Sequence, residues 1–246
     1  MTGVQVVRLG TAAAALSHLP AAADEAAAQA LGAEFVLGTQ DGALRLWRPG
    51  APETPLVVQF DEGQLGYRLS ADRVRHERLV RAVGKLQHQG WLLDATAGLA
   101  RDAALLAQAG WQVMMFEQNP VLAALIADGL ARSPAFAARM QLQPVDALQA
   151  LQQPLPVQPE VVYLDPMFPE REKTALVKKE LAWLQLLNEA PTLAQEQALL
   201  DGALAVASRR VVVKRPLPAP PLAGLKPAST LAGKTVRFDI YPVSVR

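Results

Sequence analysis

The chain has 246 residues, which is long enough for one sizeable hydrophobic core and a small additional domain. With 51% hydrophobic and 19% charged residues it is not an intrinsically disordered protein, and its net charge of +1 does not by itself predict a nucleic-acid partner. The absence of cysteine excludes disulfides and cysteine-ligated metals, and the scattered histidines lack metal-ligand spacing, so we expect no metal site.

Residues 1–65 are predicted to form a small N-terminal α/β domain. A strand at Val4–Arg8 precedes a helix at Ala22–Leu31 that ends at a glycine. Three short strands are predicted next, and an Asp-Gly pair favours a hairpin between the first two: Phe35–Gly38, Ala43–Trp47 and Leu56–Phe60.

The N-terminal stretch also has some features of a secretory signal, because it is rich in small apolar residues. No positively charged region precedes this stretch, and Arg8 interrupts it, so the signal interpretation is the less favoured one. No apolar run reaches the ~20 residues that a membrane helix requires. We therefore expect a soluble, cytoplasmic protein with no membrane partner.

Residues 66–85 carry six basic and two acidic side chains. Four apolar residues in this segment can form a stripe on a helix and leave the arginines in solvent. A basic face near a binding crevice suits contacts with RNA phosphates, for which Arg68, Arg73 and Arg75 are the candidates. A merely solvated helix face explains the same pattern equally well.

Residues 91–117 have the pattern of a nucleotide-binding β-α-β unit. An apolar run ends at Asp94, a loop of small residues follows, and apolar positions from Leu99 to Ala109 recur every three or four residues, as in a helix packed on one face. Gly110 ends this helix, and a second apolar strand, Val113–Phe116, leads directly to Glu117.

The residue types of this unit indicate the ligand. Asp94, Thr96 and Gly98 belong to the loop between the first strand and the helix, where backbone N–H groups can approach a ligand closely. Glu117 lies where an acid can accept hydrogen bonds from both hydroxyls of a ribose. The loop has one glycine instead of the three that a pyrophosphate requires, which favours S-adenosylmethionine. An ordinary β-α-β crossover that binds no ligand is the alternative.

The second motif is the apolar strand Val161–Leu164 followed by Asp165, Pro166, Met167 and Phe168. In a doubly wound sheet, Asp165 faces the same crevice as Asp94 and Glu117. An exocyclic amine is a poor nucleophile, and Asp165 with the Pro166 carbonyl can accept its two N–H bonds, while Phe168 stacks on the base. A proline-stiffened turn without a catalytic role is the alternative.

The remaining elements alternate between helices and strands. Pro120 begins a helix over Val121–Ala131, and Leu142–Pro144 is a short strand leading to Asp146. Thr174–Leu187 is predicted to be a helix, Arg209–Lys214 a strand, and Lys234–Val243 a final antiparallel strand after the proline-rich residues 216–227. Further candidates for RNA contact are Lys178 and Lys179, which are close in sequence to the Asp165–Phe168 turn but would also suit a solvated helix face. Lys214 and Arg215 are candidates because they emerge at the carboxyl end of their strand, on the active-site side.

The chain resembles the small-subunit ribosomal RNA methyltransferase J family, which methylates the exocyclic N2 of a guanosine in 16S rRNA. The resemblance covers most of residues 66–246 and rests on segments 94–103, 116–132, 161–180, 209–216, 219–223 and 237–241. It implies an S-adenosylmethionine site that is lined by Arg101, Asp102, Glu117, Gln118, Asp146, Ala147 and Asp165.

The chain departs from the family pattern at several positions. Ala100 replaces a glycine, Gln118 replaces an arginine, and Asp146–Ala147 replaces a pair of serines. An acid at position 146 can still accept a hydrogen bond from the adenine amino group. The loop after Tyr67 lacks the basic glycine-rich stretch of the family, so RNA contacts made by that stretch do not transfer.

The predicted fold is therefore a doubly wound, Rossmann-like class I methyltransferase domain over residues 66–246, with the small N-terminal α/β domain before it. The predicted reaction is N2 methylation of a guanosine in 16S rRNA, with naked rRNA or the small ribosomal subunit as the partner. Two alternatives remain: a methyltransferase for another amine, such as an adenine N6 or a protein glutamine, and a non-catalytic nucleotide- or RNA-binding module.

Overall fold

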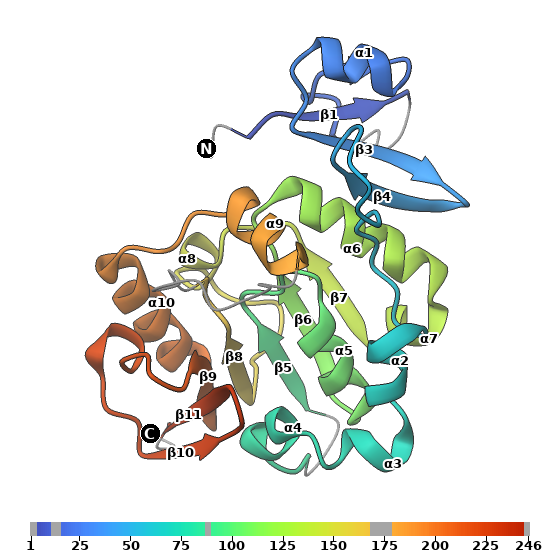
Figure 1. The fold of residues 1–246 in the computed structure, drawn as a ribbon. Coiled ribbons are helices and arrows are strands. Elements are labelled where there is room, and N and C mark those ends of the chain that lie inside the picture. The colour runs from blue at the N-terminus through green and yellow to red at the C-terminus, as the bar shows by residue number, and fades with distance from the viewer. Residues whose placement is uncertain (1–3, 11–15, 87–89, 168–178, 244–246) are drawn as a thin grey trace.

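The computed structural model describes residues 4–10, 16–86, 90–167 and 179–243. Two β-sheets organise the chain: a four-stranded sheet near the N-terminus and a seven-stranded sheet that carries the rest of the protein. Figure 1 shows the smaller sheet with α1 at one end of the molecule, above helix α6. Among the described residues, none of the helices has both the length and the apolar character needed to cross a membrane.

The smaller sheet has the strand order β2-β1-β3-β4. Strands β1 and β3 are parallel and β3 and β4 form an antiparallel hairpin whose turn contains Asp41 at a φ of 51°. Its elements are β1 (Val6–Leu9), β2 (Ala21–Ala22), α1 (Glu25–Ala30), β3 (Phe35–Gln40) and β4 (Ala43–Trp47). Strands β1, β3 and β4 and the hairpin confirm the prediction for this region.

Two details of this region differ from prediction. The predicted helix at Ala22–Leu31 begins three residues later, because Asp24 is the N-cap and accepts a hydrogen bond from the backbone N–H of Ala27. The predicted strand Leu56–Phe60 is wrong: only Leu56 pairs, in one bridge to Leu46. Leu56, Val58 and Phe60 alternate because all three are buried against the core, although the pairing with β4 does not extend past Leu56.

The larger sheet has the order β10-β11-β9-β8-β5-β6-β7, in which the five strands from β9 to β7 are parallel. Strand order reverses at β5 and β8, the arrangement of a doubly wound sheet. The strands are β5 (Trp91–Asp94), β6 (Gln112–Phe116), β7 (Met140–Gln143), β8 (Val161–Leu164), β9 (Arg210–Pro216), β10 (Ser229–Ala232) and β11 (Val236–Pro242). This confirms the predicted fold class; β10 was not predicted, and β7 begins two residues before the predicted strand.

Helices cover both faces of the larger sheet. Successive residues of one strand, such as Leu92 and Leu93, belong to two separate hydrophobic clusters because their side chains point to opposite faces. One face packs on α4 (Arg78–Val83), α5 (Arg101–Gln108) and α6 (Pro120–Arg132), and the other on α10 (Leu193–Val206). The short elements are α2 (Gly63–Arg68), α3 (Ala71–Val74), α7 (Pro134–Ala137), α8 (Ala147–Ala150) and η2 (Leu222–Gly224), and α9 (Lys179–Leu187) lies between β8 and α10 in the chain.

The basic segment 66–85 does not form one amphipathic helix. It is divided among α2, α3 and α4, with non-helical backbone at Ser70 and Glu77. The apolar residues Leu69, Val74 and Leu79 are five positions apart, so a continuous helix would place them on different faces. Breaking the helix twice buries all three of them.

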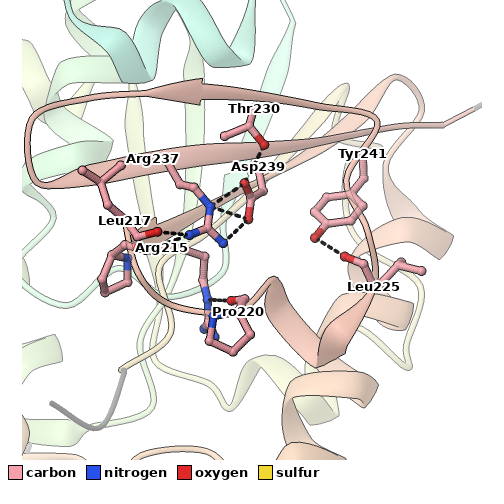
Figure 2. Close-up of polar contacts among 9 residues, drawn as sticks. Arg215, Leu217, Pro220, Leu225, Thr230, Arg237, Asp239 and Tyr241 are labelled. Carbon is pink, nitrogen blue, oxygen red and sulfur yellow. Dashed lines mark hydrogen bonds and ion pairs between the residues drawn. The ribbon is translucent and has the colours of Figure 1, made fainter. Parts of the chain in front are cut away.

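The antiparallel strands β10 and β11 extend the sheet beyond β9 and are fixed by a buried ion pair (Figure 2). Arg237 donates to both carboxylate oxygens of Asp239, which is fully buried, and Thr230 donates to the same group. Arg237 also donates to the carbonyls of Pro216 and Leu217, and thereby ties the end of β9 to β11. This anchor holds the strand that carries Lys214.

Candidate active site

Four strands of the larger sheet end at one cleft of about 1320 Å³. Asp94 ends β5, Glu117 follows β6, Asp165 follows β8, and Lys214 lies near the end of β9. All four side chains line the cleft, as expected at the carboxyl edge of a doubly wound sheet. The volume exceeds that of a pocket for a single drug-sized ligand, so it can hold a cofactor and a second group together.

The loop after β5 is built from small residues that leave room for a ligand. Gly98 has a φ of 57°, and a Cβ atom placed on it would meet no atom within 4 Å, so this side of the loop is open. Ala100 also adopts a left-handed conformation, with a φ of 56°, at the N-terminus of α5. A glycine would adopt this conformation without strain, which agrees with the glycine that the resemblance implies at this position.

Thr96 joins this loop to the turn after β8. The Thr96 backbone N–H donates to Asp94, and its hydroxyl oxygen accepts a hydrogen bond of 2.6 Å from the backbone N–H of Asp165. Asp94 is 1% exposed, and burial raises its pKa well above the usual range, with the carboxylates of Asp102 and Asp165 adding to the effect. Thr96 and Asp94 therefore shape the cleft floor.

Glu117 closes the β-α-β unit. Its carboxylate accepts the backbone N–H of Gly98 at 2.8 Å and that of Asn119 at 2.8 Å. Burial raises the pKa of Glu117 to about 7, although these backbone hydrogen bonds oppose the shift. A carboxylate has about four acceptor positions, so Glu117 can still accept hydrogen bonds from a ligand in the cleft.

Lys214 connects two carboxylates at the centre of the site. Its ammonium group lies 2.8 Å from Oδ2 of Asp102 and 2.8 Å from Oδ2 of Asp165. Burial would lower the pKa of Lys214, but the two carboxylates outweigh burial and raise it. The structure places the Lys214 ammonium between two carboxylates inside the site, and its predicted contact with RNA stays a prediction.

The two carboxylates bound by Lys214 differ in their surroundings. Burial acts to raise the pKa of Asp102, but Lys214, the Tyr163 hydroxyl and Arg68 outweigh it and lower the pKa. For Asp165, burial and the neighbouring Asp102 outweigh Lys214, so the pKa is raised. The Tyr163 hydroxyl donates to Asp102 at 2.7 Å, which leaves Asp165 as the less stabilised anion of the pair.

The other residues predicted for cofactor binding lie at the same cleft. Arg101, Gln118, Asp146 and Ala147 all line it. Asp146 is also the N-cap of α8 and accepts a hydrogen bond from the backbone N–H of Leu148. The structure thus brings together the described residues that the sequence assigned to the cofactor.

The residues predicted to contact RNA are separated by the structure. Arg73 is exposed at the cleft mouth, with its guanidinium carbon 4.0 Å from the ring centroid of the exposed Tyr67. Arg68 lines the cleft but forms a two-bond ion pair with Glu77. Arg75 pairs with Asp72 and is not among the residues that line the cleft.

Arg215 is a further correction. The sequence predicted that it contacts RNA, but its side chain is 1% exposed and pairs with Glu196 at 3.2 Å. Side chains alternate along a strand, so Arg215 points away from the face on which Lys214 lies. Phe168 and Lys178 lie outside the described residues, and Lys179 is placed only as the first residue of α9.

Several residues of the site were not predicted. The apolar pattern predicts Tyr163 only as part of a strand, although a tyrosine among the aliphatic residues of a buried strand indicates a polar partner for its hydroxyl. The segment from Asn188 to Thr192 and the start of α10 line the cleft. The Thr192–Gln195 capping box was the available sequence signal for α10.

Comparison with known proteins agrees with this geometry. The family described as "Putative SAM-dependent methyltransferase" matches residues 24–243. A protein named ribosomal RNA small subunit methyltransferase J from Alcanivorax borkumensis is 54% identical over 220 residues, which cover 89% of this chain and 88% of the relative. A protein of the same name from Thioalkalivibrio sulfidiphilus is 45% identical, over 94% of this chain and 91% of its own.

A solved structure extends the comparison to the fold. The crystal structure of a SAM-dependent methyltransferase from Neisseria gonorrhoeae superposes with a TM-score of 0.67 and 29% sequence identity. The match covers 96% of this chain and 95% of that one, so it includes both sheets.

Proposed function

The chain belongs to the ribosomal RNA small subunit methyltransferase J family of S-adenosylmethionine-dependent methyltransferases, and we propose that it methylates the exocyclic N2 of a guanosine in 16S rRNA. The observation that carries this proposal is the Asp165–Pro166 turn at the floor of the cleft, next to the open Gly98 loop and Glu117. An acceptor pair beside a cofactor site is the arrangement that a weakly nucleophilic amine requires.

The cofactor is S-adenosylmethionine, and the cleft fits it. Gly98 leaves open space where a Cβ would otherwise intrude, and Glu117 provides a carboxylate for the ribose hydroxyls. We assign Asp146 to the adenine amino group and the loop from Asp94 to Asp102 to the remaining part of the cofactor. When bound, S-adenosylmethionine supplies an electrophilic methyl group and keeps the electron pair of the broken carbon–sulfur bond.

The chain's own residues position the amine and accept its proton. One carboxylate oxygen of Asp165 and the Pro166 carbonyl accept the two N–H bonds, which directs the nitrogen lone pair away from them and toward the methyl group. As the nitrogen takes the methyl group, one of its protons passes to Asp165, and the electron pair of that N–H bond stays on nitrogen. Phe168 is the proposed stacking partner of the base, and positioning of the two reactants supplies much of the rate.

The substrate approaches along the mouth of the cleft. Arg73, Arg78 and Lys234 are exposed there and line the cleft, which supports contacts with RNA phosphates. Tyr67 is 60% exposed beside Arg73 and offers a ring for stacking. We propose that the partner is 16S rRNA, naked or within the small ribosomal subunit, in the cytoplasm, and that residues 1–65 form the small N-terminal α/β domain.

Transfer of a labelled methyl group tests this function against its alternatives. We expect label from S-adenosylmethionine to enter 16S rRNA, or small subunits that lack their modifications, and not peptides or short adenine-containing oligonucleotides. Label found only in oligonucleotides or peptides would show a methyltransferase for another amine. Absence of S-adenosylmethionine binding in calorimetry would instead support a non-catalytic module.

Glu117 should make cofactor binding dependent on pH. Only the ionised carboxylate accepts from both ribose hydroxyls, and its pKa in the free protein is about 7, so affinity falls as the pH drops through 7. We expect the Kd for S-adenosylmethionine to rise about tenfold between pH 8 and pH 6. The Glu117→Gln variant should bind more weakly with a flatter pH dependence, and an equal slope in both proteins would contradict the assignment.

A further inference from the structure

Three carboxylates and one lysine meet at the floor of the cleft, and ligand binding alone does not explain their arrangement. Asp94 ends β5, Asp102 lies in the first turn of α5, and Asp165 follows β8. The ammonium of Lys214 bridges the last two, and the side chains of Lys214, Asp102 and Asp165 are 26%, 18% and 37% exposed. Lys214 is therefore a shared cation inside the site.

The sheet itself fixes this contact. Strands β8 and β9 are parallel, and Leu164 is paired with Val213, so the next residues, Asp165 and Lys214, lie side by side at the strand ends. Asp102 reaches the same ammonium from the helix on one face of the sheet. Its position is fixed in turn by the hydroxyl of Tyr163, which also comes from β8.

The contacts divide the two oxygens of Asp165 between two tasks. Oδ2 accepts from Lys214, and the backbone N–H of Asp165 donates to the Thr96 hydroxyl. Within the described parts of the chain, no donor contacts Oδ1. Among the described residues the carboxylate is therefore held through one oxygen, Oδ2, and Asp165 lines the cleft.

We infer that Lys214 is the positioning residue for Asp165: its ammonium orients the carboxylate and keeps it ionised. Because Lys214 is shared with Asp102, its effect on Asp165 is weaker than the effect of a lysine bound to Asp165 alone. This inference rests on the proposed function, because the amine whose N–H group would donate to Oδ1 belongs to the substrate. Lys214 acts through Asp165 and does not itself contact the base. An ionised carboxylate is required because only that form accepts at Oδ1 and takes up the proton.

The charges around Asp165 determine the direction of each expected effect. Lys214 and Arg215 favour its ionised form, and Asp102 and Asp94 disfavour it. Arg68 and Tyr163 act on Asp102, and Glu77 is the ion-pair partner of Arg68. Removing Lys214 takes away a cation 2.8 Å from Asp165, whereas neutralising Asp102 removes a competing anion.

The test is the pH dependence of kcat at saturating S-adenosylmethionine and 16S rRNA, which reports ionisation in the bound enzyme. The acid limb of this profile is the range in which kcat falls as the pH is lowered. For Lys214→Met we expect it to move to higher pH by about 1–3 units, so that activity lost at pH 7 is partly regained at pH 9. Lys214→Arg retains the charge and should restore most of the activity at pH 7. Lys226→Met is the matched control, since Lys226 is exposed and away from the cleft, and its profile should equal that of the wild type.

Asp102→Asn provides an independent test that does not require the folding of a protein without Lys214. It leaves the lysine to Asp165 alone, so the acid limb should move to lower pH, opposite to the shift in Lys214→Met. The inference would be overturned if the acid limb of kcat did not shift in a folded Asp102→Asn variant. It would also be overturned if the limb shifted in the same direction in Asp102→Asn and Lys214→Met. Wild-type protein without activity on 16S rRNA would refute the proposed function itself, which separates the two failures.

Discussion

Asp165→Ala is expected to lower kcat by about 10²–10⁴-fold, because the variant loses both the acceptor for the amine and the group that takes its proton. The Kd for S-adenosylmethionine should stay within about tenfold of the wild-type value. Asp165 contacts Lys214 and Thr96, whereas the ribose is assigned to Glu117 on another strand. Single-turnover methyl transfer with preformed protein–cofactor complex measures the first quantity, and calorimetry the second.

Two variants separate chemistry from folding in this experiment. Asp165→Asn keeps the shape of the side chain but cannot take up the proton, so it should be nearly as slow as the alanine variant. Asp201→Ala removes an exposed aspartate of α10 that is not part of the cleft lining, and it should transfer methyl groups at the wild-type rate. A rate for Asp165→Ala within tenfold of the wild-type rate would remove Asp165 from the mechanism.

Asp239→Ala is expected to lower the free energy of unfolding by about 3–5 kcal/mol, because it leaves Arg237 buried without its anion. Asp239 is fully buried, Arg237 is 12% exposed, and the guanidinium binds both carboxylate oxygens (Figure 2). This pair holds β11 against β9, so local loosening should extend toward Lys214. Urea unfolding followed by tryptophan fluorescence measures the loss.

Asp72→Ala is the matched control for this stability prediction. Asp72 pairs with Arg75 at 3.1 Å, but the two side chains are 92% and 67% exposed, so water screens their interaction. Its removal should change the unfolding midpoint very little. If Asp239→Ala and Asp72→Ala lowered the free energy of unfolding equally, the buried Arg237–Asp239 pair would contribute no more to stability than an exposed pair.

The fold was predictable from the sequence because its central part obeys simple periodicities. The strands β5, β6 and β8 are short buried apolar runs: β5 ends in an acid, β6 and β8 are each followed by one, and α5 has a helical repeat between β5 and β6. Parallel strands place their carboxyl ends at one edge, so the convergence of Asp94, Glu117 and Asp165 followed from their positions in the sequence alone.

The contacts of the site were less predictable because they depend on strand order. The sequence places Lys214 at the end of a strand, but only the pairing of β9 with β8 brings it against Asp165 instead of the cleft mouth. In the same way, the sequence shows that Arg215 is charged but not that α10 offers Glu196 beneath it. Both basic residues therefore looked like candidates for RNA contact.

Periodicity also failed where burial and pairing differ. Leu56, Val58 and Phe60 alternate as in a strand, and all are buried, yet only one bridge forms. The helix α10 was missed because its apolar residues are distributed around the helix without a clear stripe, and its capping box was not used. The hydrophobic patterns of the sequence predicted which residues are buried more reliably than they predicted which strands or side chains those residues contact.

The most direct test of the central claim is the identity of the nucleoside that carries the transferred methyl group. After reaction with labelled S-adenosylmethionine, the 16S rRNA is digested to nucleosides and analysed by chromatography with mass spectrometry. The Asp165–Pro166 acceptor pair predicts methylation of an exocyclic amine, and membership of the family predicts N2-methylguanosine as the only labelled nucleoside, absent from the Asp165→Ala reaction. Label in N6-methyladenosine would contradict the proposed substrate, and label on a ring nitrogen or on a ribose hydroxyl would contradict the proposed mechanism.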